Sequence, residues 1–364
     1  MANPAQPHPF ALKPYIQRGD PAPDIQGRYR TFFETIAGRY IVLSFYQRAR
    51  DTVGQATLQA LHEHREFADK AAFVCVSSDL AEKADLKLEL VFPSLIFLWD
   101  LDALVARAYG VGSLRVWIVL DPRLRVLEVI PFRPDGSDRQ QLFAVLDGLA
   151  PPSRMLGFEI QAPFIILPNV FERELCRHLI GIFEQHGGRE SGFMLASDTT
   201  GVEAHDASVK RRRDFTITDE ALMEQINARI ARRIAPMMVS AFQFNPSRVE
   251  RYLIACYSAE DGGHFASHRD NKAKTTEHRR FAVSIFLNDD FDGGGLGFPE
   301  YGPQQIKAPV GAAVIFSSSL VHCVGKVTRG RRYAFLPFIH DEEAEKIRIA
   351  NLQSLSRPTD AKGA

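Results

Sequence analysis

From Tyr257 to Asp270 the chain reads YSAEDGGHFASHRD. In an extended strand His268 and Asp270 are two residues apart, so their side chains lie on the same face and can bind one metal ion. His322 follows 54 residues after His268, directly behind the apolar run GAAVIFSSSLV, and Arg332 stands ten residues beyond it. Two imidazoles and one carboxylate leave positions open on a metal, which suits non-haem Fe(II) and O₂ chemistry. Arg332 offers a planar fork for a co-substrate carboxylate.

Short apolar segments surround this stretch and are separated by Gly-rich or polar loops. They are VERYLIACY (249–257), RFAVSIFLN (280–288), GAAVIFSSS (311–319) and RRYAFLPFI (331–339). Several short strands at this spacing predict a sandwich or a jelly roll.

Two helices are expected before these strands. The first has Asn169 as its N-cap and ends at Gly187 and Gly188. The second has Thr218 as its N-cap and gives way to the β pattern after Pro236. Its apolar residues recur every four positions at Leu222, Ile226, Ile230 and Ile234.

The run from Tyr257 to Ile339 resembles the Fe(II)- and 2-oxoglutarate-dependent dioxygenases of the prolyl 4-hydroxylase type. The matching motifs are HxD, LNDDFDGGGLGFPEYG, PVGAAVIFSSSLVH and VTRGRRYAF, with a basic residue ten positions after the second histidine. The resemblance implies a double-stranded β-helix, a jelly roll in which His268, Asp270 and His322 are the metal ligands. It also implies that Arg332 anchors the C5 carboxylate of 2-oxoglutarate and that Tyr257 is a second contact to that carboxylate.

The same resemblance implies hydroxylation of an unactivated C–H bond with decarboxylation of 2-oxoglutarate to succinate. The implied cofactors are Fe(II), 2-oxoglutarate as co-substrate and O₂, with ascorbate as reductant. The substrate is expected to be a peptidyl, prolyl-type side chain or a small molecule. Two alternatives stay open: a sensor of 2-oxoglutarate or oxygen with low turnover, and a scaffold whose first half binds a partner.

Other interpretations compete at three positions. His264 and His268 are four residues apart and could bind zinc from a helix, although Gly262 and Gly263 disfavour a helix there. Arg331 competes with Arg332, because strand alternation lets only one of them point inward. The basic run Lys210–Arg213 is either a solvated loop or a border of the site that meets an anionic substrate.

The first half of the chain alternates strand and helix. YIVLSFY (40–46), TLQALHEHREFADK (57–70) and AAFVCVSSD (71–79) predict two parallel strands joined by a crossover helix. RVWIVLDP (115–122) and LRVLEVIPF (124–132) predict a hairpin, and a helix is expected over 138–149. The Pro-rich stretch 150–154 then predicts a linker. The expected domains are residues 12–150 and 158–342, followed by a tail over 343–364.

This α/β domain resembles the peroxiredoxins, which have a thioredoxin-like fold, from GDPAPDI (19–25) to RVWIVLDP. A peroxiredoxin needs a thiolate at the start of the helix after the first strand, where the helix dipole and an arginine lower its pKa. Gln55, or Gly54 in another alignment, occupies that place, while Arg115 stands where the family has its activating arginine. The resemblance therefore implies a non-catalytic domain that docks a partner, forms a homodimer or walls the oxygenase site.

Composition bounds the remaining functions. The chain has 364 residues, of which 45% are hydrophobic and 24% charged, as in soluble globular proteins. Lys plus Arg equals Asp plus Glu at 44 each, so no general nucleic-acid partner is expected. The four cysteines form no CxxC pair, which fits a reducing compartment. Without a secretory signal or a long apolar run, a cytoplasmic protein away from membranes is expected.

Overall fold

The computed structural model describes residues 16–18, 20–23, 32–83, 95–155, 157, 159–195 and 202–356. The chain divides into two compact units, Met1–Tyr29 with Ile36–Ile160 and Arg30–Thr35 with Gln161–Ala364. Three residues of the motif GDPAPDI, Gly19, Asp24 and Ile25, lie outside the described residues, as do 12–15 and 357–364 of the expected domain and tail.

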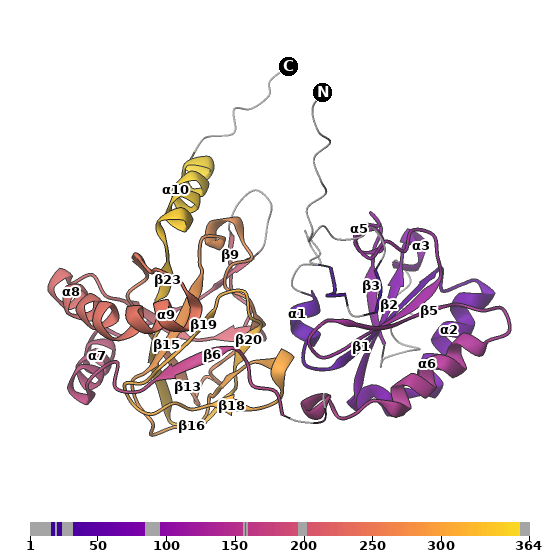
Figure 1. The fold of residues 1–364 in the computed structure, drawn as a ribbon. Coiled ribbons are helices and arrows are strands. Elements are labelled where there is room, and N and C mark those ends of the chain that lie inside the picture. The colour runs from indigo at the N-terminus through magenta and orange to yellow at the C-terminus, as the bar shows by residue number, and fades with distance from the viewer. Residues whose placement is uncertain are drawn as a thin grey trace, which may run out of the picture. The chain divides into compact units, whose positions relative to one another are not determined.

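The first unit is built around one five-stranded sheet in the order β3-β2-β1-β4-β5 (Figure 1). Strand β1 is parallel to β2, and β2 is parallel to β3, whereas β4 runs antiparallel to β1 and β5. The expected parallel pair with a crossover helix and the expected hairpin are therefore confirmed. The strands are β1 (Tyr40–Gln47), β2 (Ala71–Ser77), β3 (Ile96–Trp99), β4 (Val116–Leu120) and β5 (Val126–Pro131).

Among the described residues, the helices of this unit are α2 (Thr52–Glu63), α3 (Leu80–Lys83), α5 (Leu104–Ala108) and α6 (Ser137–Gly148). Most of α1 (Phe32–Ile36) is grouped with the second unit. The carboxylate of Asp51 caps α2 by accepting the N–H of Gly54 at 2.8 Å. A Cβ on Gly54 would lie 1.9 Å from the carbonyl oxygen of Arg48, so only glycine fits where the loop after β1 meets the helix.

The second unit contains two main antiparallel sheets. The larger one includes the order β12-β23-β15-β22-β13-β11-β7, with β19 and β6 joined to β15, and the smaller one has the order β10-β14-β20-β17-β18. The larger sheet consists of β6 (Phe164–Leu167), β7 (Arg189–Glu190), β11 (Arg213–Thr216), β12 (Arg248–Glu250), β13 (Leu253–Ser258), β15 (Phe281–Phe286), β19 (Ala313–Ser317), β22 (Arg331–Phe335) and β23 (Phe338–His340). The smaller sheet consists of β10 (Lys210–Arg211), β14 (His264–His268), β17 (Leu296–Gly297), β18 (Gln305–Ile306) and β20 (His322–Val324). Two further strand pairs are β8 (Phe193–Leu195) with β9 (Val202–Ala204), and β16 (Asp292–Gly293) with β21 (Val327–Arg329).

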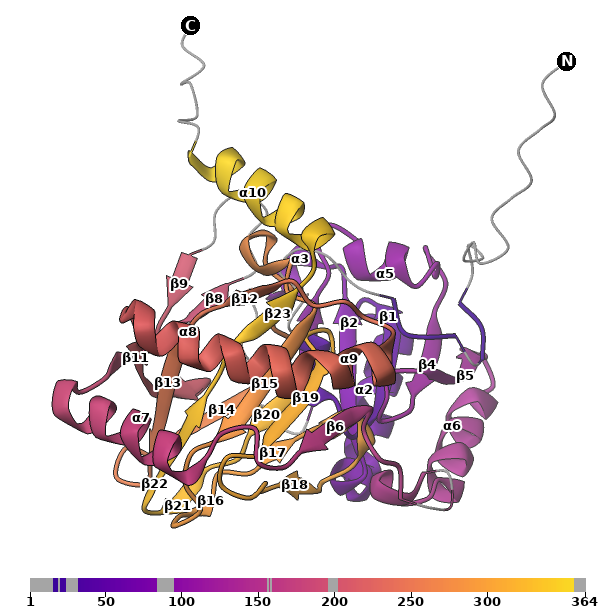
Figure 2. The same cartoon turned by 60° about the vertical axis from the view of Figure 1, so that its left-hand side comes forward.

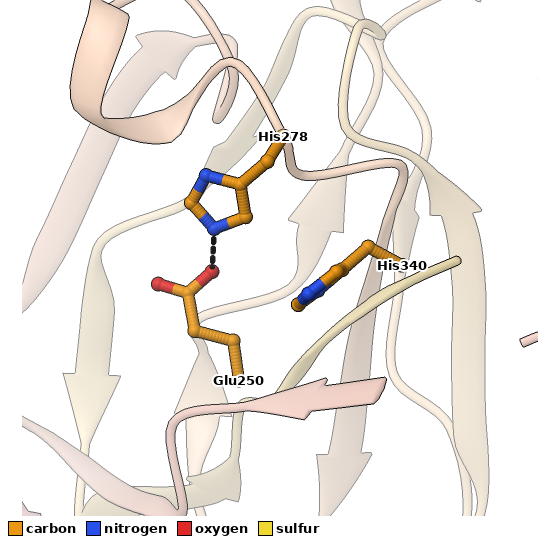
Figure 3. A group of neighbouring side chains, drawn as sticks. All are labelled: Glu250, His278 and His340. Carbon is orange, nitrogen blue, oxygen red and sulfur yellow. Dashed lines mark hydrogen bonds and ion pairs between the residues drawn. The ribbon is translucent and has the colours of Figure 1, made fainter. Parts of the chain in front are cut away.

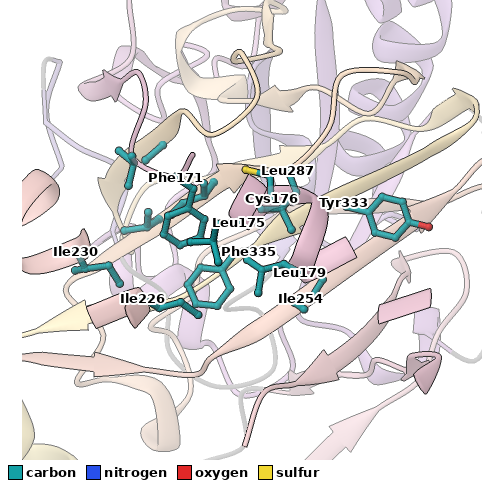
Figure 4. Packing of buried hydrophobic residues seen from close by; sticks show 14 of the residues in the cluster. Phe171, Leu175, Cys176, Leu179, Ile226, Ile230, Ile254, Leu287, Tyr333 and Phe335 are labelled. Carbon is teal, nitrogen blue, oxygen red and sulfur yellow. The ribbon is translucent and has the colours of Figure 1, made fainter. Parts of the chain in front are cut away.

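Alternation along β13 separates two cores. Leu253, Ala255 and Tyr257 belong to an apolar cluster shared by strands of both sheets, so they face the interior between the sheets. Ile254 and Cys256 belong to a second cluster with residues of helices (Figure 4). Two antiparallel sheets that face each other across an inner core form the expected jelly roll.

Helices cover the outer face of the larger sheet. Figure 2 shows α8 and α9 crossing its strands, with α7 beside them. These helices are α7 (Arg173–His186), α8 (Glu220–Arg229) and α9 (Ala235–Phe242), with a π-helical turn at Ile230–Ile234. Their buried residues, such as Leu179, Ile226 and Met238, form the outer core with β13 and β22. Because the helices cover only the outer face of the larger sheet, its opposite face can line the site.

Three helix boundaries differ from the expectation: two N-caps and the break expected at Pro236. The N-cap of α7 is Glu172, because Val170 and Phe171 donate their N–H groups to the carbonyl of Gly311 and hold this segment out of the helix. Asp219 caps α8 in place of Thr218, since its carboxylate accepts the N–H of Leu222 at 2.7 Å and also suits the positive helix end.

Pro236 does not end the second helix. The N–H of Ala235 binds the carbonyl of Ile230, five residues back, so the helix widens into a π-turn just before the proline. Pro236 then stands in the first turn of α9, where a missing N–H costs little. At the other end of the unit, the expected tail begins with a helix, α10 (Glu342–Ser356). None of the helices among the described residues is long and apolar enough to span a bilayer.

Candidate functional site

The three predicted metal ligands lie together in the smaller sheet. His268 ends β14 and pairs directly with His322, the first residue of β20. The Nε2 atom of His322 lies 3.2 Å from Oδ2 of Asp270, and Nε2 of His268 lies 3.6 Å from Oδ1. One ligand atom from each residue falls within 4.8 Å of the others. The ladder between two strands therefore brings together residues that are far apart in the chain.

Backbone carbonyls orient both imidazoles. Nδ1 of His268 lies 2.8 Å from the carbonyl oxygen of Ala266, and Nδ1 of His322 lies 3.0 Å from that of Leu320. Because a carbonyl can only accept, each Nδ1 carries the proton and each Nε2 is the atom left to bind a metal. The N–H of Asp270 donates to the carbonyl of Ser318 at 3.0 Å, which fixes the backbone next to the carboxylate.

The charge states of this cluster suit a divalent cation. Burial and the neighbouring His322 lower the pKa of His268 to about 4, so its imidazole is neutral near pH 7. Burial raises the pKa of Asp270, but His322 and His268 oppose it and hold that pKa well below the usual range. A neutral Nε2 and an ionised carboxylate both offer lone pairs to the same space. A cation between them satisfies both, so the residues fit a metal ion.

Arg332 lies in a cavity of about 500 Å³ that also reaches the metal cluster. Its side chain is 1% exposed, and Nη2 donates to Oγ of Ser284 at 3.2 Å. Among the described residues, Nε and Nη1 have no hydrogen-bond partner. Burial and Arg212 lower the pKa of Arg332 to about 10, so it stays charged near pH 7. Two unsatisfied donors on a buried guanidinium fit a carboxylate ligand.

Tyr257 lies directly opposite Arg332 in the β13–β22 ladder. The guanidinium of Arg332 lies 5.3 Å from the centre of the Tyr257 ring, and the Tyr257 hydroxyl accepts a hydrogen bond from Nη1 of Arg212 at 3.3 Å. Both predicted 2-oxoglutarate contacts therefore line the same cavity. Arg331 points the other way, is 46% exposed and pairs with Glu184 and Glu260.

The chain resembles known oxygenases over its second unit. Residues 252–340 match the 2OG-Fe(II) oxygenase superfamily. The chain is 31% identical over 182 residues to a PKHD-type hydroxylase of Shewanella sp. (strain ANA-3), covering 47% of this chain and 75% of that protein. The chain belongs to the PKHD-type hydroxylases of the 2OG-Fe(II) oxygenase superfamily.

Other relatives are matched over a smaller share of their own length. A PKHD-type hydroxylase of Pseudomonas putida (strain KT2440) is 35% identical over 145 residues, covering 36% of this chain and 62% of that protein. Among solved structures, a prolyl hydroxylase from Trichoplax adhaerens in complex with a hypoxia inducible factor peptide fragment is similar. It has a TM-score of 0.42 and 19% identity, and covers 52% of this chain and 86% of that chain.

His264 takes no part in the metal cluster. It lies on strand β14, so the helical zinc pair with His268 is wrong. Its Nδ1 lies 2.8 Å from the carbonyl oxygen of Gly262, and its Nε2 lies 3.1 Å from that of Ser208. Gly263 is required in the preceding turn, because a Cβ there would lie 2.7 Å from the backbone nitrogen of Ser258.

The basic run Lys210–Arg213 is not a solvated loop. Lys210 and Arg212 are each 6% exposed and line the cavity, whereas Arg211 and Arg213 are exposed. Arg212 pairs with Asp214 at 2.6 Å. Strand alternation along 210–213 thus sends every second basic residue into the site. Asp214, Arg251 and Ser284 also line the cavity, and the sequence analysis did not identify them.

A second group with metal-ligating side chains lies in the same unit. Glu250, His278 and His340 gather as Figure 3 shows, and both histidines are 2% exposed. The Glu250 carboxylate already accepts from Nε2 of His278 at 2.7 Å and from Nη2 of Arg279 at 2.7 Å. A metal ion would have to displace the guanidinium or lie beside its positive charge. The group is therefore a buried ion-pair network, and only its topology brings the three residues together.

The start of α2 in the first unit carries an ion pair. Arg115 binds the Asp51 carboxylate, the N-cap of that helix, and Gln55 is exposed on its first turn. Cys75 is fully buried in β2, and burial raises the pKa of its thiol to about 12. A thiol in that state is inert toward peroxide at neutral pH. The arginine expected to activate a thiolate thus pairs with a carboxylate.

Proposed function

We propose that this chain is an Fe(II)- and 2-oxoglutarate-dependent hydroxylase in which His268, Asp270 and His322 hold the iron. The observation that carries the proposal is the convergence of their three ligand atoms within 4.8 Å at the wall of a cavity. Both Nδ1 atoms are engaged by backbone carbonyls, which leaves the Nε2 atoms to the metal.

The far carboxylate of 2-oxoglutarate binds Arg332 in this proposal. Ser284 holds one end of the guanidinium, while Nε and Nη1 remain to donate to the carboxylate. Tyr257 packs against the guanidinium and completes this end of the cavity. Because Arg332 is buried, each hydrogen bond to the carboxylate forms away from water and is strengthened.

The chain's residues position the reactants and exclude water. Apolar side chains of the inner core, including Leu296, Phe316 and Val324, line the cavity around the metal cluster. Bound Fe(II) supplies the oxidation chemistry with O₂, and ascorbate keeps the iron reduced. The products are succinate, CO₂ and a hydroxylated C–H position on a peptidyl, prolyl-type or small-molecule substrate.

The expected domain over residues 12–150, most of which belongs to the first unit, is proposed to be a thioredoxin-like, peroxiredoxin-like module without peroxidase activity, joined to an oxygenase domain over 158–342. Its support is the sheet order β3-β2-β1-β4-β5 together with Gln55 at the place of the thiolate. We assign it a structural role, as a homodimerisation surface or a docking surface for a protein partner, in a cytoplasmic protein.

The test is release of succinate from 2-oxoglutarate by the full chain with Fe(II), O₂ and ascorbate. His268→Ala is expected to abolish release, whereas His264→Ala on the same strand is expected to retain it. Equal activity of the two variants would reject the metal assignment. Incubation with cell extract, followed by mass spectrometry for products that gain one oxygen atom, then identifies the substrate.

A further inference from the structure

The cavity of the second unit holds more positive charge than the co-substrate requires. Among its described lining residues, seven are Lys or Arg and two are Asp. Three of these cations have a carboxylate partner: Arg212 pairs with Asp214, Arg269 with Glu300, and Arg279 with Glu250. Arg332 is assigned to 2-oxoglutarate. The other three are Lys272, Lys210 and Arg251, and neither Lys210 nor Arg251 forms an ion pair with a described residue.

Arg251 is held in an unusual backbone conformation. Its φ is +64°, in the left-handed region that non-glycine residues seldom adopt. Its Nε atom is buried and has no hydrogen-bond partner among the described residues. The rest of the guanidinium makes weak contacts, a 3.5 Å approach of Nη2 to the carbonyl of Leu336 and a 4.5 Å stacking distance to the Phe338 ring. Strain together with an unsatisfied buried donor is typical of a ligand-binding position.

Arg251 and Arg332 come from different segments of the cavity wall. Tyr257 is opposite Arg332, and further along β13 the N–H of Leu336 donates to the carbonyl of Leu253 at 3.0 Å. Arg251 lies between β12 and β13, outside the ladder that pairs Tyr257 with Arg332. In the proposed function, one end of 2-oxoglutarate binds Arg332 and the other binds the metal. Both charged ends of the co-substrate are then engaged, and neither is left for Arg251.

Lys210 lies within electrostatic reach of Arg251. Its Nζ donates to Oγ of Ser191 at 2.7 Å and to the carbonyl of Gly192 at 2.5 Å, and both acceptors are neutral. Burial, together with the charges of Arg212 and Arg251, lowers the pKa of Lys210 to about 6, although Asp214 and Asp270 oppose this shift. Asp270 likewise raises the pKa of Arg251. Lys210 is therefore mostly uncharged near pH 7, and the guanidinium of Arg251 is the positive group that has no carboxylate partner among the described residues.

We propose that the substrate of this oxygenase is a small carboxylic acid, whose carboxylate binds the Arg251 guanidinium beside the metal cluster, with Lys210 as a neighbouring hydrogen-bond donor. This inference rests on the proposed function and narrows its substrate class. A planar guanidinium matches a carboxylate in shape and charge. A cavity of about 500 Å³ is of the size that encloses small molecules. The bound carboxylate fixes one end of the substrate, so that the C–H bonds at the other end face the metal.

The test uses benzoate as the carboxylate probe and benzamide as its uncharged match. The full chain is saturated with Zn²⁺, which does not turn over, and with 2-oxoglutarate, so that Arg332 is already occupied. Ligand-observed saturation-transfer NMR then gives the Kd of each probe. Benzoate is expected to bind at least tenfold more tightly than benzamide. Arg251→Gln is expected to weaken benzoate at least tenfold and to change the Kd of 2-oxoglutarate less than twofold.

Arg211→Gln is the matched control, because Arg211 lies on the same strand as Lys210 and is exposed. It is expected to leave both Kd values unchanged. Lys210→Met and Arg251→Lys provide the same comparison if Arg251→Gln does not fold. Equal Kd values for the two probes, or an Arg251→Gln variant that weakens 2-oxoglutarate as much as benzoate, would overturn the inference. The proposed function fails separately, if the iron-loaded chain releases no succinate.

Discussion

Arg332 lies opposite Tyr257 in the β13–β22 ladder, while its neighbour Arg331 lies opposite Ser258. Successive residues of a strand face opposite sides of a sheet, so this register sends one arginine into the cavity and the other to the surface. Arg332 is 1% exposed, whereas the side chain of Arg331 is 46% exposed. The two residues form a matched pair for testing the co-substrate site, because they share a charge and a strand but differ in environment.

We expect Arg332→Gln to raise the KM for 2-oxoglutarate about 10- to 100-fold, because a charge-assisted hydrogen bond contributes about 1.5–3 kcal/mol. Arg331→Gln should change that KM less than twofold, since its ion pairs are solvent-exposed. Succinate release at varied 2-oxoglutarate concentration measures both. A larger effect on the KM at Arg331 would show that the assignment of the carboxylate anchor to Arg332 is wrong.

Metal binding should distinguish the two groups of histidine and carboxylate side chains. Asp270→Ala should weaken Fe(II) binding by at least about tenfold, the lower limit for losing even an outer-shell partner. Glu250→Gln should leave Fe(II) binding unchanged, because Arg279 occupies that carboxylate. Anaerobic equilibrium dialysis with one Fe(II) expected per chain checks both variants. Two bound metals per chain, with one lost in Glu250→Gln, would show a second site.

The Glu250 network should matter for stability. Glu250→Ala removes the common partner of His278 and Arg279 and leaves a mostly buried guanidinium without its carboxylate. Breaking a buried pair in this way costs about 3–5 kcal/mol in the free energy of unfolding. Glu343→Ala, at an exposed position of α10, should cost about 0.5 kcal/mol or less. Urea unfolding followed by circular dichroism compares them, and equal losses would mean that the network contributes nothing.

Spacing and alternation were enough to predict part of the site. The HxD pair lies at a strand end, and period two explains why Lys210 and Arg212 enter the cavity while Arg211 does not. Arg251 and Glu250 could not be identified in this way. Their roles depend on β12, β13 and β23 meeting in one sheet, which brings residues some 90 positions apart into contact. Local pattern carries no information about such pairings.

Helix ends show the same limit. Pro236 predicts a break, yet a π-turn before it lets the helix continue, because tertiary packing of Ile234 and Met238 against the sheet stabilises the longer helix. Asn169 is a favourable N-cap by residue type, but the contacts of Val170 and Phe171 with Gly311 begin the helix three residues later. Both errors come from contacts with distant segments.

The first unit should not turn over peroxide. Cys75 is fully buried with a pKa raised to about 12, and Arg115 pairs with Asp51. His268→Ala is introduced first, to remove oxygenase side reactions. Stopped-flow consumption of H₂O₂ should then be the same with and without the further change Cys75→Ser. Consumption that disappears with Cys75→Ser would contradict the non-catalytic assignment.

Lys210 should make stability depend on pH. Burial lowers its pKa from 10.5 to about 6 in the folded chain, where it is 6% exposed. Between these two pH values the unfolded chain binds the proton and the folded chain does not, so the free energy of unfolding rises with pH. The cost of burying Lys210 is largest below pH 6 and vanishes above about pH 10.5.

Lys210→Met should therefore stabilise the chain at pH 7, and the gain should shrink by the order of 1 kcal/mol per pH unit. Urea unfolding from pH 6.5 to 9.5 measures this, with exposed Arg211→Met as the control that should show no such trend. A gain for Lys210→Met that stays constant over this range would mean that Lys210 is buried in its charged form.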